Sequence, residues 1–375
     1  MAQLVIDRRR AQSAWRQLLL HVDLVLLAAT LTVSAVGVLM VYTATRSTYA
    51  QYYLDRQGIW TLIGVGAMVL VASVDYHRFE DVGYVLYGAV LLGLVGVFVV
   101  GHNALGSTRW FQIGPLQLQP SAFAAIALIL AVATYCSRRQ EEGLNAGRVA
   151  ALLVMLAVPT VLVIKQPDLG SAIVMVIAFG AILVVAGVKL RYLAAVAVLG
   201  GLAVFLVLDL GILHHYQSGR LSSFLHQSAG TNKAAYQINQ SKITIGSGGF
   251  FGKGIGHGSQ TNLGYVPEQY TDFIFTAVGE QLGFVGTASL LALFAVILWR
   301  ILRTAQLAKD HFGRLVCAGV LGLIGFSVFQ NAGMTMGIMP ITGIPLPFVS
   351  YGGSSTIAFF AAIGLTLNVG MRRYT

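Results

Sequence analysis

Apolar runs follow one another along most of the chain and are separated by short polar segments. Ten such runs can be marked, at 24–42, 60–74, 82–100, 120–134, 149–164, 171–188, 192–213, 273–302, 315–337 and 354–369. A helix needs about 20 residues to cross the ~30 Å hydrocarbon core, and the shorter runs can extend into flanking polar residues. The runs are continuous rather than alternating, which favours helices over a membrane β-barrel. The pattern predicts an all-α integral membrane protein with about ten transmembrane helices.

The composition favours the same class of protein. Hydrophobic residues make up 56% of the 375 residues and charged residues only 10%, a balance typical of multi-pass membrane proteins. We therefore predict a single polytopic membrane domain over 1–375. Spans one to seven would occupy 17–213, a long loop 214–271, and spans eight to ten 272–375. The two cysteines, Cys136 and Cys317, fall at or in predicted spans, so neither a disulfide framework nor a cysteine metal site is expected.

The distribution of positive charge predicts the orientation. Of the 24 Lys and Arg residues, sixteen fall on the side that holds both chain ends, including Arg8, Arg9, Arg10 and Arg16. The other eight are Arg46, Arg56, Arg109, Lys165, Arg220, Lys233, Lys242 and Lys253. Since Lys and Arg are enriched in cytoplasmic segments, both termini are predicted to be cytoplasmic. The basic residues are scattered among short loops, which argues against nucleic acid as a partner.

The segment 236–286 holds the densest group of polar residues in the chain. It contains an amide-rich stretch, a glycine cluster at 246–258 and the two lysines Lys242 and Lys253. The glycine spacing matches neither the phosphate loop of nucleotide-binding proteins nor the dinucleotide-binding pattern G-x-G-x-x-G. Two interpretations stay open. The cluster is either a flexible surface loop, or its backbone N–H groups and the two lysines bind an anion such as a lipid pyrophosphate.

Two acidic residues of the eighth run are candidates for chemistry. Asp272 opens this run and is followed directly by Phe273, so it lies at the predicted membrane boundary. One alternative is a helix-capping aspartate, because acidic residues bind the free amides at helix N-termini. Partial desolvation raises a carboxyl pKa, which suits a general base, while a helix N-terminus opposes this shift. Glu280 lies inside the same apolar run, where an acid is expected to pair with a polar group of another helix.

Two further polar residues lie in predicted outer loops. Asp168 occupies a tight turn in KQPDLGSA, where it can cap the next helix or bind a ligand. Arg109 lies beside Trp110 in GSTRWFQIG, which fits either a membrane-interface anchor or a guanidinium that binds phosphate bidentately. The proline-rich stretch MPITGIPLPFVSYGGSS, at 339–355, cannot continue a helix. It is predicted to break the membrane path as a loop or re-entrant turn on the outer side.

Five separate blocks occur in the order found in one protein family. They read GSTRWFQIG with LQPS, KQPDLGSA, YQINQSKITIGSGGFFGKG, VPEQYTDFIFTAVGEQLGFVG and MPITGIPLPFVSYGGSS. On these blocks the chain resembles the SEDS proteins (shape, elongation, division and sporulation) over nearly its whole length. Within the family, GSQTNLGYVPEQYTDFIF is more similar to the elongation member than to the division member.

The resemblance implies a peptidoglycan glycosyltransferase that polymerises lipid II at the outer face of the bacterial cytoplasmic membrane, during cell elongation and rod-shape maintenance. Its substrates would be lipid II and the growing glycan linked to undecaprenyl pyrophosphate. Its partners would be a class B penicillin-binding transpeptidase and other membrane proteins of the elongation machinery. A divalent cation, Mg²⁺ or Mn²⁺, is a candidate cofactor, and no organic cofactor is expected.

The resemblance also assigns roles to individual residues. The family's essential acid falls on Asp272, which would be the catalytic base and is a candidate metal ligand. Arg109, Asp168, Lys242 and Gln260 also fall in matching blocks and are expected to bind substrate. The residues of the polar segment that are added to this set are Gln240, Ser241, Lys253 and Glu268. Among these, Arg109 with Lys242 or Lys253 would neutralise the leaving pyrophosphate. Glu280 is expected to have a structural or functional role inside the membrane because of its position in the apolar run, not because of the resemblance.

One block departs from the family pattern. After LQPS the family has a glutamate and a lysine, where this chain has Ala122 and Ala125. Residues three apart on a helix share a face and can form an ion pair, so replacement of both by alanine keeps that face neutral. We interpret the paired replacement as compensatory. The outer-face motifs are unchanged by it.

Other functions stay open at this point. A flippase or transporter of lipid-linked precursors predicts ionisable residues along a pathway near the bilayer midplane, whereas most candidates here map to the outer side. A pure scaffold for a transpeptidase would leave the glycine and lysine segment without a role. Among glycosyltransferases, a division enzyme is the alternative to an elongation enzyme.

Overall fold

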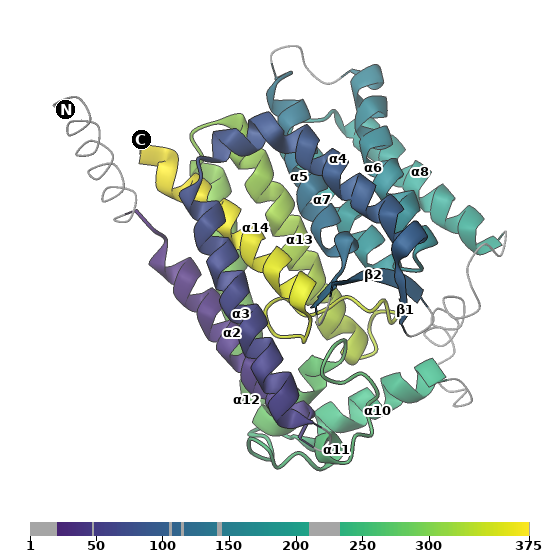
Figure 1. The fold of residues 1–375 in the computed structure, drawn as a ribbon, viewed down its shortest axis with the longest axis vertical. Helices are drawn as coiled ribbons and strands as arrows, with labels where there is room; N and C mark the ends of the chain where they lie inside the picture. The colour runs from purple at the N-terminus through teal and green to yellow at the C-terminus, as the bar shows by residue number, and fades with distance from the viewer. Residues whose placement is uncertain are drawn as a thin grey trace.

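The computed structural model describes residues 21–46, 49–104, 107–113, 116–140, 145–209 and 233–374. In this part of the chain, long helices run side by side in one bundle (Figure 1). Two predicted features lie outside the described residues. They are the basic N-terminal segment with Arg8, Arg9, Arg10 and Arg16, and the first part of the predicted long loop, 214–232.

Ten described helices match the ten predicted apolar runs. They are α2 (Leu24–Ala44), α3 (Ala50–Ser73), α4 (Tyr76–Val100), α5 (Pro120–Ser137), α6 (Ala146–Lys165), α7 (Leu169–Val185), α8 (Leu190–Asp209), α12 (Ile274–Leu307), α13 (His311–Thr335) and α14 (Gly353–Met371). Eight of the helices found in the described ranges are long and apolar enough to cross a membrane, and α7 is shorter, with 17 residues. The predicted helical, multi-pass membrane protein is confirmed, apart from one small sheet.

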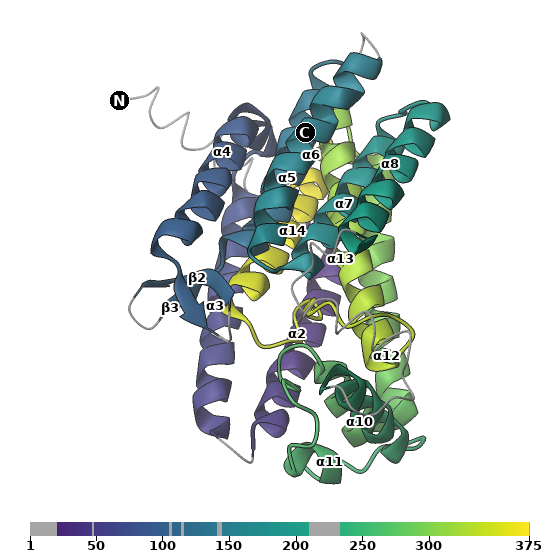
Figure 2. The same cartoon turned by 90° about the vertical axis from the view of Figure 1, so that its right-hand side faces the viewer.

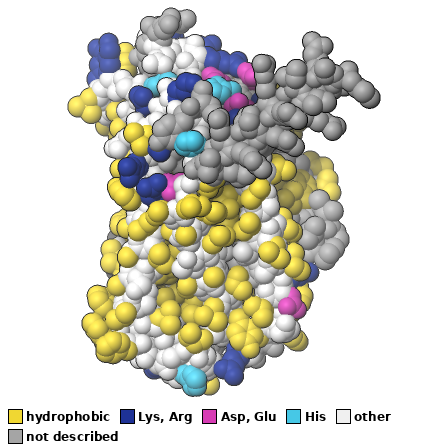
Figure 3. Space-filling view, turned by 90° about the vertical axis from the view of Figure 1, so that its left-hand side faces the viewer, with side chains coloured by type: hydrophobic (Ala, Val, Ile, Leu, Met, Phe, Trp, Pro, Cys, Tyr) yellow, Lys and Arg dark blue, Asp and Glu magenta, His cyan; other side chains and the backbone are white. Residues whose placement is uncertain are grey.

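One end of the bundle is organised by aspartate caps and ion pairs. Asp23 caps α2 and pairs with Arg300 of α12 at 2.6 Å. Asp75 caps α4 and pairs with Arg372 at 3.4 Å, and Asp310 caps α13. The C-terminus lies at this end (Figure 1), and charged side chains gather toward it, whereas apolar side chains cover most of the remaining face (Figure 3). This end corresponds to the one predicted to face the cytoplasm.

Three helices form the centre of the bundle. In α5, α13 and α14 most side chains are buried, whereas in α3 and α4 most are not. Small residues allow close approach between helices and loops. A Cβ atom at Gly364 of α14 would lie 2.6 Å from Met68 O of α3, and one at Gly37 of α2 would lie 2.5 Å from Phe348 O. Such contacts pack helices where lipid provides no hydrophobic drive for their association.

A three-stranded antiparallel sheet lies between α4 and α5. Its strands are β1 (His102–Ala104), β2 (Ser107–Ile113) and β3 (Leu116–Leu118), in the order β1-β2-β3, and Asn103 pairs with Thr108. The sequence predicted a loop here. The strands have three, seven and three residues, too few to be recognised by their periodicity among long apolar runs.

The helix α12 is interrupted near its start. At Gly283 the backbone has φ 66° and ψ −161°, and this kink separates 274–282 from 284–307. Glycine adopts such a conformation without the cost that a Cβ atom brings. Side chains 274–281 before the kink are buried, whereas Phe284 directly after it is 62% exposed. The two parts of α12 therefore have different surroundings.

We call residues 233–273 the outer cap, after the side of the membrane on which the charge distribution predicts them. The cap lies at the end of the molecule opposite the C-terminus, and it contains α10 (Lys233–Ser247) and α11 (Ser259–Asn262) (Figure 2). The long loop predicted at 214–271 is thus partly helical in its described portion. Helix α10 packs on α12 and contacts α13.

The glycine-rich segment of the cap, 248–256, is attached to α12 backbone to backbone. Four hydrogen bonds join them: Lys253 N to Glu280 O (3.0 Å), Gly254 N to Gln281 O (3.0 Å), Phe284 N to Gly249 O (3.0 Å) and Val285 N to Phe250 O (3.1 Å). A Cβ atom at Gly248 or Gly252 would overlap the α12 backbone, so glycine is required for this approach. The interpretation of the cluster as a flexible surface loop is wrong, because backbone hydrogen bonds in both directions fix it to α12.

Replacing Gly252 with alanine is expected to destabilise the outer cap, with Gly246→Ala as the control. Gly252 has φ +81° and faces Gln281 O, so a Cβ atom adds a left-handed backbone cost of about 1–2 kcal/mol and a steric overlap. The Cβ position of Gly246 has no atom within 4 Å. We expect the apparent melting temperature of the purified protein to fall by several degrees for Gly252→Ala only. Equal melting temperatures for the two variants would contradict the docking.

Candidate functional site

Asp272 lies in the turn that precedes α12. The helix begins at Ile274, and its N-cap position is Phe273, so the predicted capping position is not taken by Asp272. Asp272 is half-buried. Its backbone N donates to Glu268 O at 3.1 Å, and its O accepts a hydrogen bond from Asn331 Nδ2 at 2.9 Å. The peptide groups of this acid are thus fixed from both sides.

Glu268 opens the same turn in a strained conformation. It is exposed and has φ +54°, in the left-handed region that side chains other than glycine rarely adopt. Its carbonyl oxygen accepts hydrogen bonds from the backbone N of Thr271, Asp272 and Phe273. Strain of this kind is found disproportionately at functional sites, which agrees with the predicted importance of the turn.

Asn331 of α13 holds the Asp272 turn in place. It is fully buried, and its Nδ2 donates both to Asp272 O and, at 2.8 Å, to Ile344 O. Its Oδ1 is buried without a hydrogen-bond partner. One side chain therefore joins α13, the turn and the proline-rich segment. Sequence reasoning missed Asn331, although an amide inside an apolar run is a signal of a buried polar contact.

The proline-rich segment lies beside the same turn. Residues 336–352, between α13 and α14, contain no helix, so the predicted break is confirmed. Tyr351 N donates to Tyr270 O at 2.9 Å, and the Tyr53 ring of α3 lies 4.9 Å from Tyr270 and 5.1 Å from Tyr351. Burial raises the pKa of Tyr270 and of Tyr351, so both phenols are neutral at physiological pH. These neutral rings connect α3 to the turn that carries Asp272.

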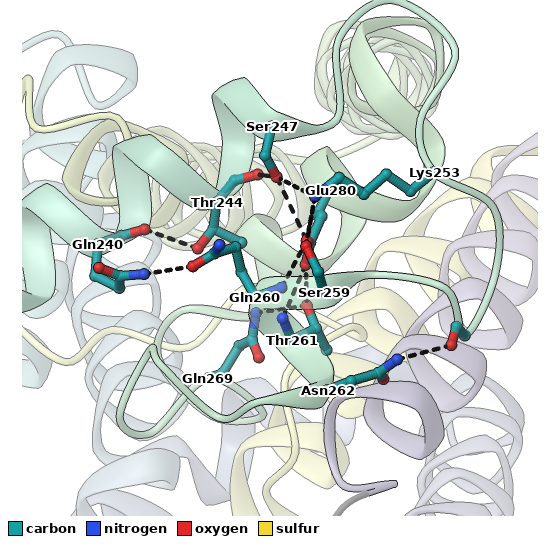
Figure 4. Close-up of polar contacts among 11 residues, drawn as sticks. Gln240, Thr244, Ser247, Lys253, Ser259, Gln260, Thr261, Asn262, Gln269 and Glu280 are labelled. Atoms are coloured by element: carbon teal, nitrogen blue, oxygen red, sulfur yellow. Dashed lines mark hydrogen bonds and ion pairs between the residues drawn. The ribbon is translucent and has the colours of Figure 1, made fainter.

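The Glu280 side chain is fully buried in the part of α12 that precedes the kink. Figure 4 shows its carboxylate surrounded by donors of the outer cap. The donors are Lys253 Nζ (3.0 Å), Gln260 N (2.8 Å), Thr261 N (2.9 Å), Thr261 Oγ1 (2.7 Å), Ser247 Oγ (3.4 Å) and Ser259 Oγ (3.4 Å). The expected pairing with polar groups of another helix is confirmed, because Ser247 belongs to α10 and Gln260 and Thr261 belong to α11.

The two lysines of the predicted site have different surroundings. Lys253 Nζ contacts Glu280 and two serine hydroxyls of the cap, and 30% of its side chain is exposed. This ion pair gives Lys253 a structural contact rather than a free approach to substrate. Lys242 of α10 is exposed, and its Nζ would lie 2.8 Å from a Cβ atom at Gly337, just past the end of α13.

Two polar residues of α10 orient this helix. Gln240 Nε2 donates to Gln260 Oε1 at 2.5 Å, which links α10 to α11. Ser241 Oγ is buried and donates to Thr335 O at 2.6 Å, at the end of α13. Both residues were predicted to bind substrate, and in the structure both join elements of the site to one another.

Arg109 extends from β2 to the turn between α6 and α7. Its Nε donates to Gln166 O at 2.8 Å, and its Nη2 donates to Pro167 O. A guanidinium has five N–H donors, so two contacts with carbonyl groups leave others for an anion. Phosphate binding by Arg109 stays a prediction.

Asp168 caps α7 and is 6% exposed. Its carboxylate accepts hydrogen bonds from Ser171 N (3.2 Å), Ser171 Oγ (2.8 Å), Ser121 Oγ (2.9 Å) and Gln119 Nε2 (3.2 Å). Of the two alternatives for this residue, the structure supports capping. The same carboxylate also joins α7 to the start of α5.

The two alanines that replace the family's ion pair lie on α5 directly after Ser121. Ala125 is 5% exposed and belongs to the apolar core, and Ala122 is half-buried. An unpaired charge at such a position carries a desolvation penalty of several kcal/mol, roughly. Joint replacement by alanine avoids this penalty, in agreement with a compensatory change.

The side chains around the Asp272 turn include few possible ligands for a divalent cation. The described residues contain no group of three or more His, Cys, Asp or Glu side chains that could hold a metal ion. Mg²⁺ is commonly bound by one or two carboxylates together with substrate phosphates. Asp272, with Glu268 in the same turn, offers the one or two carboxylates that such a cation, bound together with substrate phosphates, requires.

Contacts divide the predicted site residues into three groups. Asp272 and Glu268 share the turn before α12, close to where Ser241 and Lys242 meet the end of α13. Glu280, Lys253, Gln260 and Gln240 form the network of the outer cap. Arg109 and Asp168 flank the turn between α6 and α7.

Comparisons with known proteins bear on the family. The model of the cell cycle protein family of FtsW, RodA and SpoVE matches residues 18–375. The probable peptidoglycan glycosyltransferase FtsW of Geobacter metallireducens is 35% identical over 360 residues, which cover 93% of this chain and 95% of that protein. The peptidoglycan glycosyltransferase MrdB of Escherichia coli K12 is 34% identical over 369 residues, which cover 98% of each chain.

Solved structures give the same result. A chain from a peptidoglycan synthase complex that coordinates polymerization and crosslinking has a TM-score of 0.81 and 30% identity, and the match covers 94% of this chain and 99% of that one. The rod shape determining protein RodA of Thermus thermophilus has a TM-score of 0.71 and 30% identity, with 94% and 98% covered. The chain therefore belongs to the FtsW, RodA and SpoVE family, the SEDS proteins that its motifs indicate.

Proposed function

We propose that this protein is a peptidoglycan glycosyltransferase that polymerises lipid II at the outer face of the bacterial cytoplasmic membrane. The observation that carries the proposal is the Asp272 turn, where Asn331 fixes an acidic residue between α12, α13 and the proline-rich segment. The FtsW and MrdB relatives are named as peptidoglycan glycosyltransferases, which supports the proposal. The substrates are lipid II and a growing glycan linked to undecaprenyl pyrophosphate.

In the proposed reaction the Asp272 carboxylate is the general base. It removes the proton from the acceptor hydroxyl of lipid II, and the hydroxyl oxygen attacks the anomeric carbon of the growing glycan. The new glycosidic bond forms while the bond between the anomeric carbon and the pyrophosphate oxygen breaks. Undecaprenyl pyrophosphate leaves with the electron pair. A single displacement of this kind inverts the anomeric carbon.

The leaving pyrophosphate requires positive charge near the oxygen on which charge develops. Lys242 is the favoured residue, because its side chain is exposed and lies beside Gly337, just past the end of α13, the helix whose Asn331 holds the Asp272 turn. A divalent cation held by Asp272 and the pyrophosphate would supply further neutralisation. Arg109 keeps enough donors to assist from the sheet side.

The same observations support a proposed partner and a proposed orientation. One chain of similar fold belongs to a complex that couples polymerization to crosslinking, so a class B penicillin-binding transpeptidase is the proposed partner, together with other elongation proteins. The end with Asp23, Asp75 and Arg372 would face the cytoplasm and the outer cap the opposite side.

A role in division is the second candidate. It is favoured by the FtsW relatives, which match this chain as well as MrdB does. The elongation motif GSQTNLGYVPEQYTDFIF favours the first candidate. Restoration of rod shape in cells lacking their own elongation enzyme, compared with restoration of division in cells lacking the division enzyme, separates the two.

Purified protein supplied with fluorescent lipid II is expected to form penicillin-insensitive polymer linked to undecaprenyl pyrophosphate. Asp272→Asn should lower the rate about 10²- to 10⁴-fold, because an amide cannot accept the proton. Asp55→Asn, which alters an exposed carboxylate bonded to Gln51 at the start of α3, should keep full activity. Undiminished synthesis by Asp272→Asn would overturn the assignment of the base.

Lys242→Gln is expected to slow the reaction, whereas Lys253→Gln is expected to destabilise the fold. Loss of Lys242 should lower kcat per folded molecule about 10²-fold, because one charge at the leaving group is removed. Loss of Lys253 removes a hydrogen bond to a buried carboxylate, worth about 1.5–3 kcal/mol, and should lower the apparent melting temperature. The measurements are initial rates and thermal unfolding of both variants. The reverse pattern would exchange the two roles.

Asn331→Leu is expected to lower kcat about 10²-fold while the KM for lipid II stays the same, because a misplaced base slows the chemical step. Ser327→Ala is the control. Its buried hydroxyl donates to Leu323 O on the same helix, away from the turn. A variant Asn331→Leu that loses melting temperature to the same extent as activity, with kcat per folded molecule unchanged, would show that Asn331 only stabilises the fold.

A further inference from the structure

The outer cap carries an aromatic patch that the proposed reaction does not use. The patch consists of Phe250, Phe251 and Phe284, which are 60%, 80% and 62% exposed. The centroid of the Phe250 ring lies 5.0 Å from that of Phe251 and 5.5 Å from that of Phe284. Large apolar side chains that adjoin one another at a surface mark contact with another apolar phase or molecule.

Backbone hydrogen bonds fix the height of the patch on α12. Phe284 N donates to Gly249 O, and Val285 N donates to Phe250 O. Because the glycine-rich segment is attached at these two points, Phe250 and Phe251 lie level with the first turn of α12 after the kink.

The length of α12 shows where the aromatic patch lies relative to the hydrocarbon core of a membrane. Near the other end, Trp299 is 54% exposed, and the guanidinium groups of Arg300 and Arg303 lie 5.6 and 5.7 Å from its ring. Tryptophan and arginine at a helix end mark a membrane–water interface. The helix from 284 to 303 rises ~30 Å at ~1.5 Å per residue, which equals the hydrocarbon thickness. Phe284 therefore lies at the opposite interface.

Helix α2 independently gives the same distance between the two interfaces. Its start is joined to α12 by the Asp23–Arg300 ion pair, and near its end Thr43 Oγ1 accepts a hydrogen bond from Gln281 Nε2 at 3.0 Å. The rise from Asp23 to Thr43 is ~30 Å, and that from Gln281 to Arg300 is ~29 Å. Both helices thus cross one hydrocarbon thickness between the same two levels, and the outer level coincides with the patch.

We propose that the aromatic patch inserts into the outer-leaflet interface of the bilayer and anchors the outer cap to the lipid. Aromatic rings favour this interfacial region. The patch is also continuous with the lipid-facing side of α12, where Phe284 is followed by the exposed Val285. The anchored segment carries Lys253, which binds Glu280, so the lipid surface holds the cap at a fixed height beside the Asp272 turn.

The native cysteines make the anchor measurable. Cys136 and Cys317 are buried, at 3% and 0% exposure, so a new surface cysteine can be labelled selectively. Phe251→Cys in the full-length protein would be labelled with the fluorophore NBD in detergent and reconstituted into nanodiscs of phosphatidylcholine and phosphatidylglycerol. His257→Cys, exposed six residues further along the same segment, is the matched control.

NBD at position 251 is expected to emit at shorter wavelength than NBD at 257, and to be quenched several-fold more strongly by a nitroxide on the lipid acyl chain than by aqueous iodide. At 257 iodide should be the stronger quencher. Phe284→Cys tests the same level from α12 if a loop variant fails to fold. Iodide quenching at 251 and 284 equal to that at 257 would overturn the proposal. Shielding from both quenchers at 251 would also overturn it, because a protein contact would then cover the patch.

Discussion

The buried carboxylate of Glu280 is the contact on which the outer half of the structure depends. Its donors come from the end of α10, from the glycine-rich segment and from α11. A buried carboxylate is strongly unfavourable unless it is paired and hydrogen-bonded, so the cap is stable on α12 only when these donors reach it together. This requirement explains why glycine occupies positions of the cap that lie against α12. A Cβ atom at Gly258, for example, would lie 2.6 Å from Glu280 Oε2.

The same carboxylate fixes one end of a short helical segment whose other end follows Asp272, the proposed general base. Residues 274–282 run from the Asp272 turn to Glu280, and Asn331 holds the turn at the opposite end. Both anchors are buried polar groups at 0% exposure, where hydrogen bonds are directional and their geometry is well defined. Precise placement of a general base requires such support, since small displacements of reacting groups slow a reaction strongly.

The sequence predicted the features that depend on local hydropathy. Ten apolar runs became ten helices, and the proline-rich segment broke the helical path, because span length and proline geometry act within one element. It did not predict which polar groups meet. Lys242 and Lys253 are equivalent as basic residues of one polar segment in the sequence, and only the fold shows that Lys253 is paired with Glu280. Asn331 was missed for the same reason, since its partners lie 59 and 13 residues away in the chain.

The length of α12 explains how a buried acid can lie within an apolar run. Helix α12 has 34 residues and is ~51 Å long, well beyond the ~30 Å of hydrocarbon, so its apolar run cannot lie wholly in lipid. The surplus lies before Gly283, where protein rather than lipid covers the side chains. Apolar residues in 274–282 therefore pack under the cap. Because protein surrounds this segment, a buried acid and a non-helical turn can flank it, an arrangement that exposure to lipid would forbid.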